Sequence, residues 1–379
     1  MLIFSSYSSF YNDRQQQKEM PLRAYIDNEE IISIDQDERQ WEDLKKRLKS
    51  KESVLTLPCC QKVGFLRTSS KGLRHFVHAK SDNTCDWKSE SPEHLRAKIE
   101  IIEACKENGW KAIPEFSETN WRADVLAIQN DKRIAFEVQW SKQTFEDTKF
   151  RQDRYKESNV RGCWFFRTAP KELREYDEHL KADREIPAFK IFKDENSNII
   201  AQLKQTQLPL KSLVDSLLKR KLKFCDHIRL KPKQEVTIVF FETSCWKCKK
   251  PQHLWTVEQN LVTVCNQDFY LMRSMWDNDD IDKSPKIYDA VKQFLQTDKG
   301  KNLKIGQLKK RYSKTVHESY LSHGCFFCDS IFGDWFLNTE KMDGQNDPNS
   351  LRHIVEIEFG TVKEDGQHWC YSDNGHFCE

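Results

Sequence analysis

The sequence lacks any run of about 18 consecutive apolar residues, so it predicts no transmembrane helix and no membrane partner. Its first residues, 1–4, lack the basic head and the long apolar body of a signal peptide, and we therefore expect a soluble cytoplasmic protein. An excess of one charge is also missing, because 61 basic residues face 59 acidic ones. Net charge therefore does not indicate a nucleic-acid partner, and only local clusters of charge can do so. There is no repeat or low-complexity tract.

Cysteine is plentiful, with 13 residues, an odd number. Some of these cysteines form C-x-x-C pairs, whereas a disulfide framework would spread them along the chain. Metal ligation in a reducing compartment fits this distribution better. At 379 residues the chain is long enough for two or three domains with cores of their own.

The most informative stretch, residues 122–141, reads as one β-hairpin that carries a carboxylate on each strand. Two apolar runs flank a turn signal at residues 130–132. A two-residue turn there places Asp124 opposite Glu137, and Gln139 shares their face because side chains alternate along a strand. Two carboxylates inside a hydrophobic pattern require a compensating cation, for which a hard divalent ion such as Mg²⁺ is the simplest candidate.

Two interpretations of this hairpin are open. In the functional one, Asp124 and Glu137 bind Mg²⁺ or Mn²⁺, and Gln139 orients a water molecule for phosphodiester hydrolysis. In the other one, a surface hairpin pairs its two carboxylates with Arg122 and Lys132.

The elements around the hairpin predict an α/β fold with a mixed central sheet. A helix is expected over residues 91–109, with a serine N-cap and a glycine stop, and a strand over residues 110–116 follows it. After the hairpin, the pattern predicts a polar helix over residues 145–157 and a buried strand over residues 162–166.

Side chains on the two helices are spaced so that they can reach the hairpin. His94 and Lys98 lie one turn apart on the first helix, and Arg151 and Tyr155 lie one turn apart on the second. Arg151 is a candidate for holding a phosphate oxygen, and Tyr155 for stacking or hydrogen bonding. Glu115, on the strand before the hairpin, is a candidate for an additional metal ligand. A solvated helix face is the alternative for the first pair.

Over roughly residues 20–170, the order and spacing of these motifs resemble the competence protein CoiA family. The motifs are Arg74-His-Phe-Val-His78, Glu90-Ser-x-Glu-His94-x-x-x-Lys98, Arg122-Ala-Asp124-Val, Phe136-Glu-Val-Gln139-x-Ser141, and Arg151-x-x-x-Tyr155 followed by Trp164. The resemblance implies a restriction-endonuclease-like core of the PD-(D/E)xK type, flanked by helices and accompanied by a small zinc-binding module, and a role in processing DNA such as that taken up in transformation. It also implies supporting roles for Arg122 and Ser141. Gln139 replaces the usual lysine of that superfamily.

Two groups of cysteine and histidine residues predict zinc sites. In the first group, Cys60, His75, His78 and Cys85 offer the thiolates and imidazoles that Zn²⁺ selects, and Cys59 is able to replace its neighbour. The alternative is a strand that buries one of the two imidazoles and exposes the other.

The second group is a split zinc ribbon, with the ligands Cys245, Cys248, Cys325 and Cys328. A helical insertion over about residues 284–312 is expected between its two halves. Two C-x-x-C pairs without a thioredoxin-like pattern argue against a redox function. Further His-x-Cys pairs at residues 368–370 and 376–378 also have ligand chemistry, and we assign them no role.

DNA contact is predicted from the basic runs at residues 219–233 and 299–311, which could neutralise phosphates. The aromatic residues near the ribbon cysteines are interpreted as the core of the zinc module rather than as base-stacking residues. These aromatics are Trp246, Trp255, Phe326, Phe327 and Trp335.

These patterns divide the chain into six segments. They are an N-terminal β-hairpin and helix (1–54), a zinc-binding segment (55–90), a nuclease-like core (91–202), a basic linker helix (203–233), a split zinc ribbon with a helical insertion (234–340) and a C-terminal tail (341–379). The predicted function is metal-dependent hydrolysis of DNA, single-stranded DNA included. The alternatives are a catalytically silent DNA-binding adaptor of the same fold and an anti-phage defence nuclease within a larger complex. Each is compatible with a homo-oligomer or a protein partner.

Overall fold

The chain divides into two compact units, residues 1–224 and residues 225–379. Within the described residues, no helix is long and apolar enough to cross a membrane. The computed structural model describes residues 21–70, 72–78, 85, 90–175, 179–203, 206–258, 261–265, 268–269, 285–361 and 363–378.

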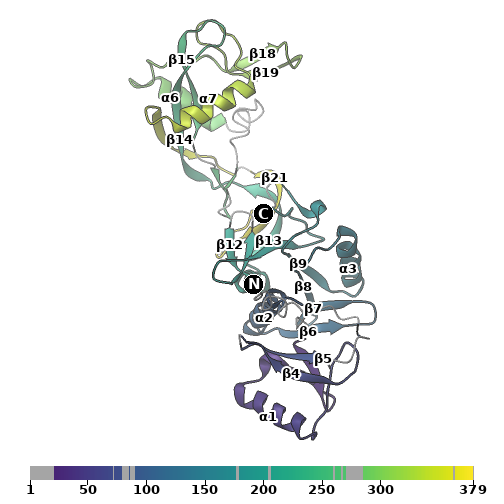
Figure 1. Cartoon of the computed structure of the whole chain (residues 1–379). Helices are drawn as coiled ribbons and strands as arrows, with labels where there is room; N and C mark the ends of the chain where they lie inside the picture. Colours follow the sequence, from purple (N-terminus) through teal and green to yellow (C-terminus); the bar gives the residue numbers. More distant parts are fainter. Residues whose placement is uncertain are drawn as a thin grey trace, which may run out of the picture. The chain divides into compact units, whose positions relative to one another are not determined.

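The first unit begins with a small module that has one hydrophobic core (Figure 1). Its elements are β1 (Arg23–Ile26), β2 (Glu29–Ile32), the short helix η1 (Ser33–Asp35), α1 (Glu38–Lys49), β3 (Leu55–Thr56), β4 (Gly64–Thr68) and β5 (Arg74–His78). Trp41 of α1 packs on Phe76 of β5, with ring centroids 5.7 Å apart. The predicted N-terminal hairpin and helix therefore share a core with strands of the predicted zinc-binding segment.

A seven-stranded mixed sheet forms the centre of the first unit, in the order β12-β11-β10-β9-β8-β7-β6. Strands β8, β9 and β10 are parallel, and the other neighbours are antiparallel. The predicted α/β class with a mixed central sheet is confirmed. The strands are β6 (Lys111–Ser117), β7 (Arg122–Gln129), β8 (Lys132–Gln139), β9 (Arg161–Phe166), β10 (Ala188–Lys193), β11 (Ile199–Leu203) and β12 (Thr206–Pro209).

Helices flank this sheet. Helix α2 (Pro92–Glu107) packs against β6, β7 and β8, whereas α3 (Phe145–Glu157) packs against β9 and the short helix η2 (Lys171–Leu173). The side chain of Ser91 caps α2 by accepting the His94 N–H. The helices predicted over residues 91–109 and 145–157 are confirmed, because local capping and apolar spacing determine where both begin and end.

Residues 203–233 are not the basic linker helix that was predicted. They contain β12, the short helix α4 (Leu210–Leu218) and the strand β13 (Leu222–Arg229). Leu210, Leu213 and Val214 of α4 are buried, and the helix packs against α2. The basic residues flank this apolar stripe and do not interrupt it, so burial of the stripe determines the structure.

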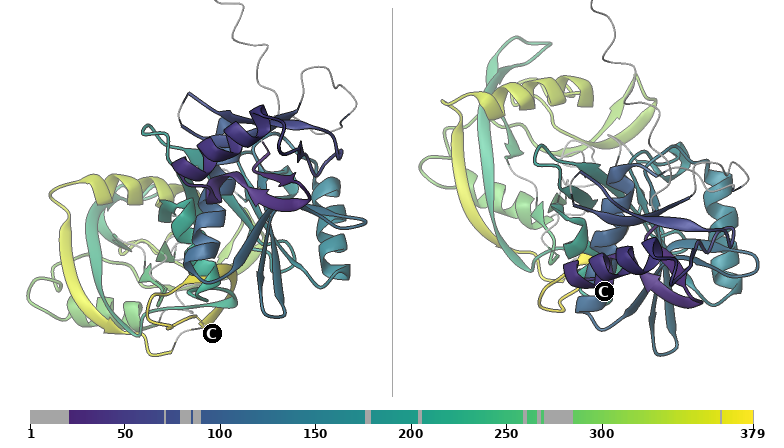
Figure 2. Two further views of the ribbon diagram at one scale, coloured as in Figure 1. Left: turned by 90° about the horizontal axis from the view of Figure 1, so that it is seen from below. Right: turned by 60° about the horizontal axis from the view of Figure 1, so that its bottom comes forward.

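The described residues of the second unit form one three-stranded sheet and three two-stranded sheets. Strand β14 (Lys233–Ser244) pairs with β15 (Pro251–Val257) and with β20 (Leu351–Glu358), which runs beside it in Figure 2, and β13 pairs with β21 (Lys363–Tyr371). Helix α6 (Pro285–Leu295) packs against β20, and α7 (Asp334–Asn346) packs against β14 and β15. In the other two sheets, β16 (Leu261–Val262) pairs with β17 (Asp268–Phe269), and β18 (Lys309–Ser313) pairs with β19 (Glu318–Ser322).

Residues 341–379 are not a tail, because they contain the end of α7 and all of β20 and β21. Ile357 and Phe359 are buried in one core with Val236 and Ile238 of β14. The charged residues of β20 alternate with apolar ones, as in a strand with one buried face. This alternation is short, and no strand was predicted from it. The predicted helical insertion over residues 284–312 contains one helix, α6, and the start of β18.

Candidate nuclease centre and metal sites

The register of the central hairpin places Asp124 opposite Glu137. Residues 125–129 of β7 pair with residues 132–136 of β8, in the register that the predicted turn requires. Asn130 has the positive φ, 51°, that a two-residue hairpin turn demands. The interpretation of this stretch as one hairpin is therefore confirmed. Asp124 and Glu137 are the next pair of opposite residues in this register.

Asp124 is held by helix α2 and by the backbone of β8. One carboxylate oxygen, Oδ2, lies 3.3 Å from Nε2 of His94 and accepts a hydrogen bond of 2.8 Å from the Val138 N–H. Burial raises the pKa of Asp124, but the charge of His94 and its hydrogen bond, together with the charges of Lys98 and Arg151, outweigh burial and bring that pKa well below its usual value. In the same pair, burial lowers the pKa of His94, but the charge of Asp124, its hydrogen bond and the charge of Glu90 together raise that pKa above its usual value. Asp124 is therefore ionised at neutral pH.

Glu137 is fully buried and faces helix α3. Its Oε2 lies 2.5 Å from Nη2 of Arg151, and its Oε1 accepts a hydrogen bond from the Tyr155 hydroxyl. Burial raises the pKa of Glu137 to about 7, against the opposing charge of Arg151. Burial and the charge of Glu137 also raise the pKa of Tyr155, so the phenol keeps its proton and donates it. The Arg151 guanidinium lies over the ring of Trp164, 5.1 Å from its centroid.

Lys98 is fully buried between two carboxylates. Its Nζ lies 2.8 Å from Oε2 of Glu90 and 2.5 Å from Oε1 of Glu115. Burial lowers the pKa of Lys98, but the two carboxylates more than offset this and raise it above its usual value. A solvated helix face is therefore the wrong interpretation for Lys98, whose ammonium group positions the carboxylates around it.

Glu115 joins the N-terminal module to the central sheet. Its carboxylate accepts the backbone N–H groups of Leu22 and Arg23, at 3.2 and 3.1 Å, in addition to the ammonium group of Lys98. Its φ of 47° interrupts the pairing of β6 with β7 opposite Asp124, a conformation that costs of order 1–3 kcal/mol and that these bonds offset. These contacts give Glu115 a structural role. Glu115 was predicted to be an additional metal ligand.

Three ligand-type side chains converge at the start of α2. The ligand atoms of Glu90, His94 and Asp124 all lie within 4.8 Å of one another. Glu90 was not among the predicted site residues. Glu90 lies one residue before the N-cap of α2, outside the predicted helix. Only the CoiA-like motif that it begins could have indicated it as a site residue.

The remaining predicted residues border this centre. Gln139 is half-buried at the end of β8, two positions after the buried glutamate. The carbonyl oxygen of Arg122 accepts the Tyr155 hydroxyl at 2.6 Å, while the Arg122 side chain is exposed. Ser141 is exposed just beyond β8. The structure thus brings His94, Asp124, Glu137, Arg151 and Tyr155 together, with Gln139 beside them.

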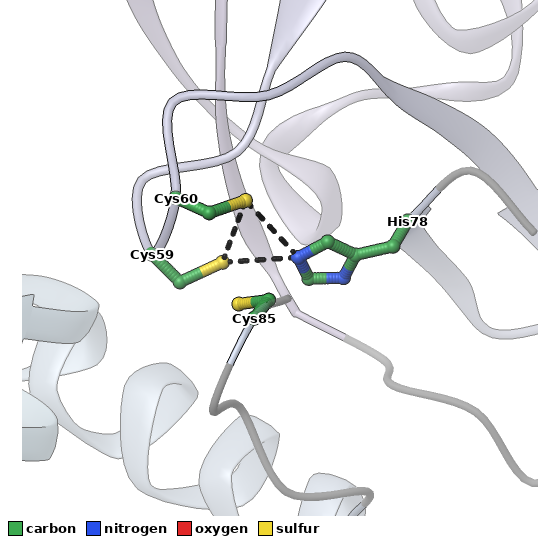
Figure 3. A group of neighbouring side chains, drawn as sticks. All are labelled: Cys59, Cys60, His78 and Cys85. Carbon is green, nitrogen blue, oxygen red and sulfur yellow. Dashed lines mark hydrogen bonds between the residues drawn. The ribbon is translucent and has the colours of Figure 1, made fainter. Parts of the chain in front are cut away.

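The first candidate zinc site consists of Cys59, Cys60, His78 and Cys85, whose ligand atoms all lie within 4.8 Å of one another (Figure 3). The two adjacent thiols are 3.8 Å apart and lie 3.2 and 3.3 Å from Nε2 of His78. A tetrahedron with zinc bonds of about 2.3 Å to sulfur and about 2.0–2.1 Å to nitrogen has edges of about 3.6–3.8 Å. The distance between the two sulfurs matches such an edge, and the two nitrogen–sulfur distances are shorter than one. The four side chains are thus close enough together that the group could hold zinc.

His75 lies outside this group, and Cys59 takes the place that was predicted for it. The His75 ring is buried, with Nδ1 3.1 Å from the Leu73 carbonyl oxygen. Because side chains alternate along β5, residues three apart point to opposite faces, so His75 and His78 cannot chelate one ion. The strand buries the His75 imidazole, as the alternative had it, but His78 is half-buried and stays in the predicted ligand group.

The second candidate zinc site is the predicted ribbon. The ligand atoms of Cys245, Cys248, Cys325 and Cys328 lie within 4.8 Å of one another. The sulfur of Cys245 is 3.7 Å from that of Cys328, and the sulfur of Cys248 is 3.6 Å from that of Cys325. The predicted grouping of these four cysteines is confirmed, and the group could hold zinc.

Both halves of the ribbon use the same turn. In each, the N–H of the first cysteine donates to the carbonyl five residues later, and its own carbonyl accepts the N–H four residues later. The residue after the second cysteine has a positive φ, 59° at Lys249 and 58° at Asp329. The same turn recurs at residues 57–62, where Leu57 occupies the position of the first cysteine. Because leucine cannot bind a metal, the turn provides its two thiols from the adjacent residues Cys59 and Cys60.

The aromatic residues of the ribbon do not all belong to its core. Trp255 is buried, as predicted. Trp246, Phe326 and Phe327, which lie on the two cysteine turns, are 52%, 51% and 40% exposed, so the core interpretation is wrong for these three. The side chain of Trp335 lies outside the described residues.

Comparison with known proteins finds one similarity, which covers part of the chain. Residues 90–239 match the family model of the competence protein CoiA nuclease-like domain. The match begins at Glu90 and includes α2, the central hairpin and α3, whereas residues 20–89 of the predicted resemblance lie outside it. A search of curated proteins finds no match. Residues 90–239 are therefore similar to the nuclease-like domain of the competence protein CoiA.

Proposed function

We propose that the nuclease-like domain hydrolyses phosphodiester bonds of DNA in a metal-dependent reaction, at the centre formed by Asp124 and Glu137. One observation carries the proposal: the half-buried carboxylate of Asp124 lies opposite the fully buried carboxylate of Glu137 on the adjacent strand, with His94 paired to the first and Arg151 to the second. Nuclease sites concentrate negative ligands in this way to hold a cation against the phosphate. The family match supports a nuclease-like domain but not the particular chemistry.

The donor set fits Mg²⁺ or Mn²⁺. Asp124 and Glu137 would hold the ion through carboxylate oxygens, the hard ligands that both ions prefer. When bound, such an ion supplies neutralisation of the phosphate and a lower pKa for a bound water molecule. Gln139 is suited to orient that water, because its side-chain amide both donates and accepts hydrogen bonds. It carries no charge, so it does not stabilise an anion as a lysine would.

The cationic side chains around the carboxylates divide into structural and substrate-facing groups. Lys98 is inaccessible and positions Glu90 and Glu115. Arg151 is fixed by Glu137 and by stacking on Trp164, while 30% of its side chain stays exposed, so it is suited to hold a phosphate oxygen.

The proposal is tested by incubating the purified full-length chain with plasmid DNA and with linear single-stranded DNA. Parallel reactions contain Mg²⁺, Mn²⁺ or a chelator. We expect cleavage with either ion and none with the chelator. Cleavage at the same rate in the chelator would contradict metal dependence, and binding of DNA without cleavage in every reaction would favour the second candidate function below.

We predict that affinity for Mn²⁺ depends on pH through Glu137. Its raised pKa, about 7, means that the carboxyl is protonated below that value and must lose the proton to bind a cation. Affinity should therefore fall roughly tenfold per pH unit below about 7 and stay level above it. Isothermal titration calorimetry from pH 5.5 to 8.5 measures this. The pKa of His94 is also raised, so His94 could contribute to the pH dependence. His94→Gln is the matched control, and its affinity for Mn²⁺ should depend on pH in the same way as that of the wild type. A flat profile in the wild type would sink this assignment.

DNA binding without cleavage is the second candidate function. It is favoured by Gln139 and by the exposed aromatic side chains on the ribbon turns. The ammonium groups of Lys250 and Lys304 lie 4.9 and 5.6 Å from the ring centroid of Phe327. Exposed rings beside lysines can stack on the bases of a single strand while the lysines neutralise its phosphates.

The two basic runs support DNA binding less than was predicted. Lys219, Lys233 and Lys309 form ion pairs with acidic side chains of their own unit, at 2.6–2.8 Å. Arg311 is buried, and its Nε donates to Asp329, which follows the second ribbon turn. A lysine or arginine that is already paired with an acidic side chain releases fewer counterions when DNA binds.

Replacing Phe326 by alanine should weaken binding of single-stranded DNA. The loss of one base-stacking ring corresponds to about 1–3 kcal/mol, or roughly a 5- to 150-fold increase in Kd. Fluorescence anisotropy with a labelled oligonucleotide measures the effect. Ile354→Ala is the matched control, since Ile354 is 62% exposed in the same unit but lies on β20 and not on a ribbon turn. Equal affinity of Phe326→Ala and the wild type would exclude this surface.

A further inference from the structure

The second unit contains another group of ligand-type side chains, outside both the nuclease-like domain and the ribbon. Cys265, His368, Cys370 and Cys378 are all buried, and their ligand atoms lie within 4.8 Å of one another. The first follows β16, the next two lie on β21, and the last lies in the segment after β21. The group therefore joins three parts of the chain, and His368 lies 103 positions after Cys265.

The distances in this group are those of a tetrahedral zinc site. The sulfur of Cys265 is 3.6 Å from Nε2 of His368 and 3.6 Å from the sulfur of Cys378. Zinc bonds of about 2.3 Å to sulfur and about 2.0–2.1 Å to nitrogen predict edges of about 3.6 Å between nitrogen and sulfur and about 3.8 Å between two sulfurs. A disulfide would bring the sulfurs to about 2.05 Å, so the two cysteines are not oxidised to one.

Hydrogen bonds around the group prepare its ligands for a cation. Nδ1 of His368 lies 3.1 Å from the Gly366 carbonyl oxygen, which accepts the ring N–H and leaves Nε2 free to bind a metal. The backbone N–H of Cys378 donates to the sulfur of Cys370 at 3.4 Å. The Thr263 hydroxyl lies 3.1 Å from the sulfur of Cys265. Donors directed at sulfur stabilise thiolates, the form in which cysteine binds metal.

Among the described residues, this end of the unit has almost no apolar core. Strands β13 and β21 form a two-stranded sheet, which is marginally stable by itself. The buried cluster beside this sheet consists of one phenylalanine and four cysteines, namely Phe377, Cys225, Cys265, Cys370 and Cys378. Thiols bury little apolar surface compared with leucine or phenylalanine. A metal cross-link replaces such a core in small domains.

We propose that Cys265, His368, Cys370 and Cys378 bind a structural Zn²⁺ ion, which ties β21 and the C-terminal segment to the chain after β16. Three thiolates and one imidazole are ligands that zinc prefers over magnesium. All four positions of the tetrahedron belong to the protein, so the site is closed and is not catalytic. On binding, the thiol protons pass to the buffer. This site is independent of the proposed nuclease function.

The test is the zinc content of the full-length chain, measured by native mass spectrometry. With all three sites occupied, the wild type should contain three zinc ions. His368→Gln should contain one fewer than the wild type. His368→Cys should recover that ion, since a thiolate is an equivalent ligand and a merely packed histidine would not be rescued. Cys225→Ser is the matched control, because Cys225 is buried in the same cluster but lies outside the ligand group.

Unchanged zinc content in His368→Gln would overturn the proposal, and so would an equal loss in Cys225→Ser. A second measurement needs no variant. In the wild type, alkylation of Cys378, mapped by peptide mass spectrometry, should be slow and should accelerate at least tenfold when a zinc chelator is added. Equal rates with and without the chelator would mean that burial alone protects the thiol, and would overturn the proposal.

Discussion

Asp124→Asn is expected to lower the rate of DNA cleavage by a factor on the order of 10³ or more. Asparagine has nearly the same shape as aspartate but no charge. Of the two proposed ligands, only Asp124 is fully ionised at neutral pH, so this variant removes that charge from the centre. His94 loses its charged partner at the same time. The measurement is the initial rate under single-turnover conditions, with Mg²⁺ and with Mn²⁺.

Asp131→Asn is the matched control for this variant. Asp131 lies in the turn of the same hairpin and is exposed, so its amide variant should cleave at the wild-type rate. Circular dichroism should show the same fold for both variants. Cleavage by Asp124→Asn at the wild-type rate would place the reaction elsewhere in the chain.

Lys98→Met is expected to lower the free energy of unfolding of the first unit by about 3–5 kcal/mol. The methionine fills similar space but leaves the carboxylates of Glu90 and Glu115 buried without their cation. The midpoint of urea denaturation, followed by tryptophan fluorescence, reports the loss. Glu115→Gln in the Lys98→Met background should recover part of it, because it removes one of the two unpaired charges.

Lys106→Met is the control on the same helix. Lys106 pairs with Asp35, and both side chains are more than a third exposed, so this ion pair contributes at most about 1 kcal/mol. If Lys98→Met and Lys106→Met unfold at the same urea concentration, the buried pairing of Lys98 does not stabilise the unit.

The nuclease-like core was largely predictable because its signals are local. A capping serine, a helical spacing of apolar residues and a glycine stop determine α2 within one stretch of sequence. The turn at Asn130 then sets the register of β7 and β8, and with it the opposition of Asp124 and Glu137. Each of these inferences requires only neighbours along the chain.

The contacts of the carboxylates were not predictable, because they depend on distant residues. Glu115 accepts the N–H groups of Leu22 and Arg23, more than 90 positions away, and no pattern near Glu115 indicates them. Cys265 and His368 meet for a similar reason, since only the folded second unit brings their segments together. His75 is different. The alternation along a strand would have excluded it as a partner of His78 from the sequence alone.

The position of Mn²⁺ in a crystal of the full-length chain, located by anomalous scattering, tests the proposed centre most directly. We predict one Mn²⁺ ion bound by the carboxylates of Asp124 and Glu137, at about 2.0–2.2 Å from the ligating oxygens, and no ion there in crystals of Asp124→Asn. Mn²⁺-dependent cleavage of DNA by a protein whose crystals hold no Mn²⁺ at these two carboxylates would contradict the assignment.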